Sequence, residues 1–278
     1  MRRTLLPALL IATAHPMNAQ MSTPHDHHDA ATNSSLAPII ARAREAAEIF
    51  SDRKAAIARG YRRVGRDLPM MGEHWLNTRL LVDGIMDVAR PQVLTYLDVG
   101  GKPRLTGVVY AIALKPGEVP PDIFGEQAMW HEHNGSIDEE ALVPEHHSTA
   151  STTTGTRVAF LHVWTHMPSS ESVFAAENWA LPFVRAGLSV PDRFSNYAAR
   201  SVSLIDGGGE YYMDMIGSRG DSAVFDRYAV EAGEVVLQAK VDHRALTGPE
   251  LVRLDEIWRR LLRDVEASTG VDTMRRIK

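Results

Sequence analysis

Five histidines in the body of the chain fall into three short groups, and this grouping is the feature of the sequence that most directly indicates chemistry. The five are His74, His131, His133, His162 and His166. Neutral imidazole is a good ligand for zinc, copper and iron, and two or three imidazoles with a carboxylate leave a coordination position open for water or substrate. The sequence therefore predicts a site for one divalent metal ion and leaves open which of these metals it is.

Extended backbone would place these side chains on common faces, because successive side chains of a strand point to opposite sides. If residues 129–133 are extended, their two histidines share a face. The same rule puts the two histidines of a strand over residues 157–166 on one face, together with Trp164. We therefore expect a cavity floored by His162 and walled by aromatic side chains.

Three glutamates are the nearest candidates for a carboxylate ligand or a proton acceptor. Glu132 alternates with His131 and His133, so it should point away from them on a regular strand. This leaves Glu73, beside His74, and Glu177 as the predicted catalytic residues.

The histidines also have a structural interpretation, since a single buried histidine is more often a hydrogen-bonded core residue than a ligand. This applies most to His166, at a strand end before a proline. His162 is the stronger candidate, because a lone polar residue in an apolar strand needs a reason to be buried. His146-His147 and His243 are expected in solvated loops.

Composition excludes several other kinds of site. The chain has no cysteine, which rules out disulfides, zinc–thiolate sites and iron–sulfur clusters. Its formal net charge is −5 with the two signs mixed, so a nucleic-acid partner is not expected. No G-x-S-x-G motif supports a serine hydrolase, and the triplet Gly207–Gly209 lacks the residues of a phosphate-binding loop.

The N-terminus reads as an export signal. Met1-Arg2-Arg3 precedes an apolar run that is too short to span a bilayer, so residues 1–19 are interpreted as a signal peptide and the mature chain as periplasmic or secreted, with no membrane span. Residues 20–35 are predicted to form a disordered, polar and histidine-rich tether. Residues 36–278 are predicted to form a single globular domain, with a C-terminal subdomain allowed from about residue 192.

The elements that must position the histidines are predicted from hydrophobic spacing and turn residues. The expected elements are an amphipathic helix over residues 36–61 ended by Gly60, a hairpin of residues 92–97 and 105–114, a central strand over 157–166, a helix over 172–186 broken near Pro182, a hairpin of residues 202–205 and 211–216, and a C-terminal helix that begins with a capping box at Thr247–Glu250 and ends at Gly270. The order predicts an α+β fold, mainly an antiparallel sheet with an N-terminal amphipathic helix and a C-terminal helix.

With these motifs identified, residues 71–188 resemble a family of uncharacterised, exported bacterial proteins. The resemblance rests on the segments Met71–Asn77, Pro91–Tyr96, Leu105–Tyr110 and Leu161–Trp164, followed by Phe174 and Asn178. It implies export and a shared fold around His74 and His162, and it names no substrate. The chain departs from the family pattern at Met167–Ser172, where family members carry an Asn-Pro-x-Gly turn.

Three hypotheses for function follow from the sequence. The first is an exported metal-binding protein, either an oxidoreductase or a hydrolase acting on a small molecule. The second is a non-catalytic carrier of a metal or small ligand in the cell envelope. The third is a partner-binding module whose histidines are structural.

Overall fold

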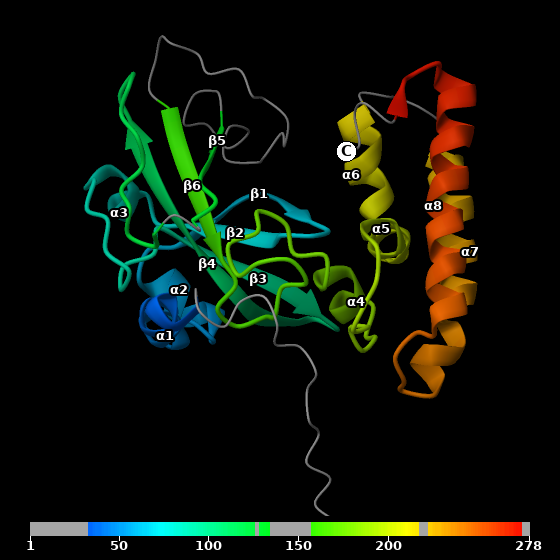
Figure 1. Cartoon of the computed structure of the whole chain (residues 1–278), viewed down its shortest axis with the longest axis horizontal. Coiled ribbons are helices and arrows are strands. Elements are labelled where there is room, and N and C mark those ends of the chain that lie inside the picture. The colour runs from blue at the N-terminus through cyan, green and yellow to red at the C-terminus, as the bar shows by residue number, and fades with distance from the viewer. Residues whose placement is uncertain (1–32, 126–127, 134–156, 217–221, 274–278) are drawn as a thin grey trace, which may run out of the picture.

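The computed structural model describes residues 33–125, 128–133, 157–216 and 222–273. Within these residues the fold is α+β, as predicted: a curled antiparallel sheet of six strands lies beside a group of helices, with a helix at each end of the described chain (Figure 1). The predicted signal peptide lies outside the described residues. So does most of the predicted tether, except that its last three residues begin the first helix.

The sheet has the order β1-β2-β3-β4-β6-β5, and all neighbouring strands are antiparallel. The strands are β1 (Arg62–Leu68), β2 (Gly72–Leu76), β3 (Val93–Val99), β4 (Lys102–Leu114), β5 (His131–His133) and β6 (Arg157–Val163). The predicted hairpin is confirmed as β3 and β4, since Gly100 and Gly101 both have positive φ, as a tight hairpin turn requires. The predicted strand over residues 157–166 is confirmed as β6, which is paired on both sides but ends at Val163.

The predicted N-terminal helix is interrupted. It consists of α1 (Asn33–Glu48) and α2 (Arg53–Ala58), because Asp52 leaves the helical conformation and accepts a hydrogen bond from the Lys54 amide as a new N-cap. Helix α1 packs with Phe50 and Tyr61 over one face of the sheet. Gly60, with φ +95°, ends this region as predicted.

Two of the elements predicted for residues 172–216 are wrong. Residues 172–180 are irregular and only α4 (Leu181–Arg185) is helical, because Pro182 lies in the first turn, where its missing N–H costs nothing, and therefore starts the helix. The predicted hairpin around residue 208 is instead the helix pair α5 (Asn196–Leu204) and α6 (Gly208–Ile216).

The glycine triplet between α5 and α6 explains that error, since it serves a tight helix-to-helix connection. Gly207 has φ +84°, a conformation that favours glycine. A Cβ on Gly208 would lie 2.6 Å from the carbonyl oxygen of Ser203, so only glycine fits there.

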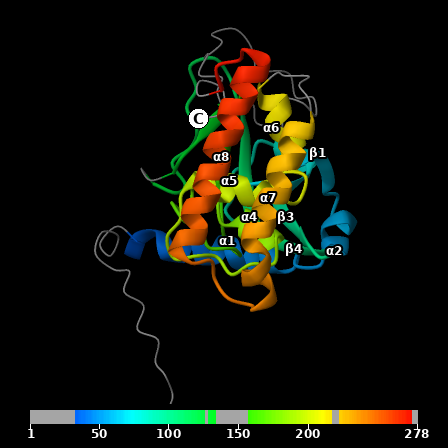
Figure 2. The ribbon, with the colours of Figure 1, turned by 90° about the vertical axis from the view of Figure 1, so that its right-hand side faces the viewer.

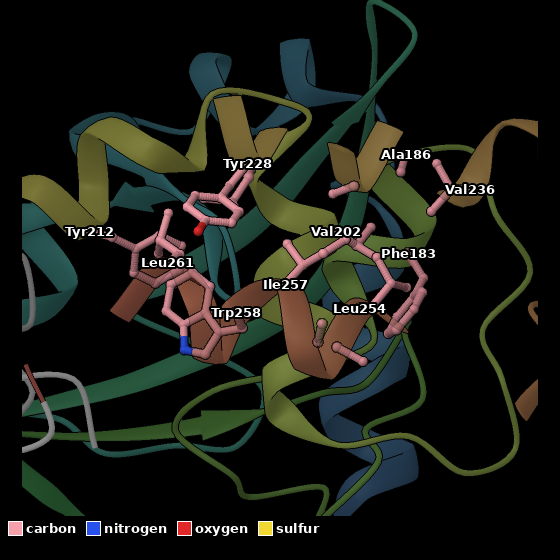
Figure 3. Close-up of a cluster of buried hydrophobic side chains, with 14 of the residues drawn as sticks. Phe183, Ala186, Val202, Tyr212, Tyr228, Val236, Leu254, Ile257, Trp258 and Leu261 are labelled. Carbon is pink, nitrogen blue, oxygen red and sulfur yellow. The ribbon is translucent and has the colours of Figure 1, made fainter. Parts of the chain in front are cut away.

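The last two helices are α7 (Ser222–Val241) and α8 (Gly248–Thr269), which face the viewer in Figure 2. The predicted capping box of α8 is confirmed by hydrogen bonds between Thr247 and Glu250, and Gly270 ends the helix with φ +69°. Figure 3 shows the core that these helices share, in which Trp258 of α8 packs among side chains of α5, α6 and α7. The end of β1 and the turn that follows it contribute Leu68, Met70 and Met71 to the same core, which joins the helices to the sheet.

The remaining helix, α3 (Thr78–Val82), follows β2 and is capped by Asn77. Of the helices in the described ranges, none combines the length and the apolar character needed to cross a bilayer.

Candidate functional site

One face of the sheet carries three of the predicted metal ligands. Cross-strand partners share a face, and the register pairs His74 with Thr95, Val109 with His162, and Phe160 with His131. Following these pairs across the sheet places all three histidines on the face opposite α1, which we call the histidine face. Around them pack apolar side chains that include Val93, Val109 and Phe160.

The three imidazoles are neighbours in space although they come from three separate segments. The ring centroids of His74 and His162 are 5.5 Å apart with an interplanar angle of 74°, and those of His131 and His162 are also 5.5 Å apart. His162 is 3% exposed and His74 is 8% exposed, so water reaches these two rings poorly. The sheet therefore brings together the histidines of all three sequence groups.

Trp164 connects this cluster to the segment that carries Glu177. Its ring centroid lies 5.7 Å from that of His162, and its indole N–H donates a 2.7 Å hydrogen bond to the carbonyl oxygen of Ala175. The Trp164 amide also donates to the carbonyl oxygen of Val173. One aromatic side chain thus spans the distance between the imidazoles and the residues just before Glu177.

Glu177 differs from an ordinary surface carboxylate. Burial raises its pKa to about 7, and the positive charge of Arg200 opposes this rise only in part. Arg200 is itself buried, with its guanidinium 4.8 Å from the ring centroid of Trp179. A carboxyl group in this setting can accept or release a proton near neutral pH.

Glu73 is not brought to the histidines. It precedes His74 on β2 and points to the opposite face, where its carboxylate is 2.8 Å from Arg53 and 3.0 Å from Arg63 and also accepts a hydrogen bond from the Trp75 indole. The strand alternation that separates Glu132 from its neighbours applies to Glu73 as well. These contacts make Glu73 a buried ion-pair residue that ties α2 to the sheet.

The other predicted ligands lie apart from the cluster or cannot be placed. His166 follows the end of β6, and its ring is hydrogen-bonded to Thr165 and to Glu48 of α1, on the face opposite His162. The backbone of His133 pairs with Val158 on β6, but its side chain lies outside the described part of the chain. Glu132 points away from the histidine face, as predicted, and pairs with Arg157.

Sequence reasoning missed Thr95, which lies opposite His74 on the histidine face and is fully buried. Its hydroxyl accepts a 2.9 Å hydrogen bond from Thr106. The signal was available, because Thr95 is a polar residue within the apolar part of β3, a feature similar to the one that identified His162.

The three rings do not form a finished coordination shell. Among the described residues, no group of three or more His, Asp or Glu side chains has its donor atoms placed to hold a metal ion. Ring rotation about the Cβ–Cγ bond is a soft torsion in histidine, so donor direction is less fixed than ring position.

A separate, small polar pocket, partly open to solvent, lies between β1 and the start of α6. Its lining includes the ion pair of Arg185 with Asp67, together with Arg66, Asp206 and Glu210. Acidic and basic side chains nearly balance there, so the lining does not select a ligand by charge.

No family model, no curated protein and no solved structure matches this chain. The resemblance to exported bacterial proteins stays a prediction, and arguments about function therefore depend on the geometry of the histidine face.

Proposed function

We propose that the chain is an exported metal-binding protein in which His74, His131 and His162 hold one divalent transition-metal ion. The observation that carries this proposal is that the imidazoles of His74 on β2 and His131 on β5 each lie 5.5 Å, centroid to centroid, from the imidazole of His162 on β6. Two of these rings, His74 and His162, are buried in the sheet, where a metal ion would be shielded from bulk water.

The ring spacing agrees with the size of a metal–imidazole site. With metal–nitrogen bonds of about 2.1 Å and a near-tetrahedral angle, the centres of two coordinated imidazoles lie roughly 5 Å apart. The two observed separations of 5.5 Å are close to this value. Three neutral imidazoles suit zinc, copper or iron and leave a fourth position for water or substrate.

Glu177 favours an enzyme over a carrier. A bound metal would lower the pKa of a coordinated water, and Glu177, whose segment is joined to the cluster through Trp164, has a pKa suited to accepting that proton. A carrier with a closed coordination shell has no use for such a group. Of the two enzyme classes considered, this combination favours a hydrolase acting on a small molecule.

Metal content is the first test. The full chain, prepared without an affinity tag and with His25, His27 and His28 of the tether replaced by alanine, should contain close to one zinc, copper or iron ion per chain after equilibration and dialysis. His162→Asn should lower this to less than about a tenth, since a three-imidazole site loses most of its affinity with one ligand. His243→Asn is the matched control, because His243 is exposed and asparagine tolerates its positive φ of 50°.

An equal metal content in the two variants, or less than about a tenth of an ion in the parent chain, would overturn the proposal.

Cobalt(II) substitution then distinguishes an enzyme from a carrier. If a position is open, added azide should change the visible spectrum of the cobalt protein. An unchanged spectrum would indicate a closed shell and a carrier.

A further inference from the structure

The outer surface of α7 carries a regular seam of four exposed residues with a half-buried glycine at its centre. Moving along the helix in steps of four and three, the seam consists of Asp226, Val230, Gly233, Leu237 and Lys240. Val230 is 65% exposed and Leu237 is 61% exposed, and the neighbouring Val241 extends the apolar part of the seam. Alternating steps of four and three are the spacing with which one helix packs lengthwise on another.

Gly233 at the centre of the seam has no role inside the chain. It lies in the middle of a 20-residue helix, where glycine is unfavourable, and a Cβ built on it meets nothing within 4 Å. A small residue on an exposed helix face allows the backbone of a second helix to come close.

If two copies of the seam pack antiparallel, the charges at their ends are complementary. Asp226 lies seven residues before Gly233 and Lys240 lies seven residues after it. Within the described part of the chain neither residue forms an ion pair. An antiparallel copy crossing at Gly233 would place Asp226 of each chain opposite Lys240 of the other, and it would place Val230 beside Leu237.

We propose that α7 is a self-association surface through which two copies of the chain form an antiparallel, two-fold symmetric dimer crossing at Gly233. The helix is accessible for this role, because α7 and α8 form the outer layer of the helical side of the molecule (Figure 2). A single helix pair buries less surface than a standard stable interface, so the dimer should be weak, with a dissociation constant on the order of 10–100 μM.

Sedimentation equilibrium of the full chain between 1 and 500 μM should show a reversible monomer–dimer equilibrium, and Leu237→Glu should leave only monomer. Val252→Glu is the matched control, since Val252 is 67% exposed on the neighbouring helix α8 and lies outside the seam. A chain that stays monomeric over this range, or a dimer that Leu237→Glu leaves intact, would overturn the proposal.

A charge exchange tests the antiparallel geometry. Asp226→Lys alone and Lys240→Asp alone should each weaken the dimer about tenfold or more, because each creates two pairs of like charges across the two-fold axis. The double variant should restore association. Failure of the double variant to recover would exclude the crossing at Gly233.

Gly233→Ala gives an independent readout. Alanine should raise the melting temperature of the monomer, since it favours the helix and has free space, while its methyl group should weaken the dimer. Tighter association together with a higher melting temperature would contradict the close crossing. None of these measurements depends on metal, so the dimer and the proposed metal site can fail separately.

Discussion

The sheet and the helical group bury polar side chains in different ways. In the helical group the buried polar residues are dispersed, and the hydroxyls of Ser201 and Ser203 donate to the backbone carbonyls of Leu254 and Arg200. On the histidine face, by contrast, imidazoles from three strands gather at one place. Dispersed hydrogen bonds hold helices in position, whereas a cluster of like side chains is a common feature of binding sites.

Under the proposed function, the chain separates stability from chemistry. The core of the helical group is built from apolar and aromatic side chains of α4 to α8 and from the β1–β2 turn. The histidine face has a smaller apolar cluster around its imidazoles. We therefore expect substitutions in the helical core to change stability and substitutions on the histidine face to change metal binding.

Trp258→Ala should have the largest effect on folding. Trp258 is fully buried and its ring centroid lies 4.7 Å from that of Tyr212, so its removal should lower the free energy of unfolding by about 3–5 kcal/mol, measured by urea denaturation. Metal content per folded chain should not change. Trp130→Ala, at a partly buried position packed against the cluster under α1, should cost less. A similar loss of unfolding free energy in both variants, or loss of metal from the Trp258 variant, would contradict the distinction between the two regions.

The parts of the fold that the sequence predicted correctly are those with local signals. The β3–β4 turn and the two ends of α8 are set by glycines and a capping box, whose effects act within a few residues. The helices α5 and α6 were missed because a glycine triplet between two apolar segments resembles a hairpin turn. The requirement for glycine at residue 208 comes from the approach of Ser203, which depends on tertiary structure.

The candidate site could be predicted as far as strand alternation reaches. Alternation correctly separated Glu132 from His131, and applied to β2 it would have separated Glu73 from His74 as well. It could not show that β6 ends at Val163. Because the strand ends there, His166 is not held on the histidine face and instead bonds to Glu48 of α1. Nor could it show that Trp164 reaches Ala175, because that contact joins an element to an irregular segment.

Glu177→Gln tests the residue proposed as the proton acceptor. In the unfolded chain this carboxyl group titrates near pH 4.5, and in the folded chain its pKa is about 7. Because the folded state binds the proton more tightly, the stability that Glu177 contributes is fully present below about pH 4.5 and is lost as the pH rises through about 7. The glutamine variant should match the parent near pH 4 and be more stable by roughly 1–3 kcal/mol at pH 8.

Urea denaturation between pH 4 and pH 8 measures this difference, with Glu234→Gln, at an exposed position on α7, as the control. Parallel stability profiles for the parent and the Glu177 variant would show that the carboxyl group is not held in a poorly solvated environment, and the case for it as a proton acceptor would be lost.

Glu250→Gln should have the smallest effect, at a purely structural position of the helical group. The ion pair with Arg244 and hydrogen bonds from Thr247 hold the pKa of Glu250 at about 2, against 4.5 in the unfolded chain. Its contribution is therefore present above about pH 4.5 and is lost as the pH falls toward 2. At pH 7 the substitution should cost about 1 kcal/mol, since glutamine keeps part of the capping box. The cost should disappear near pH 2, and metal content should stay at the parent value. A change in metal content would mean that the cap of α8 and the histidine face are coupled, contrary to the separation of stability and chemistry proposed for the two regions.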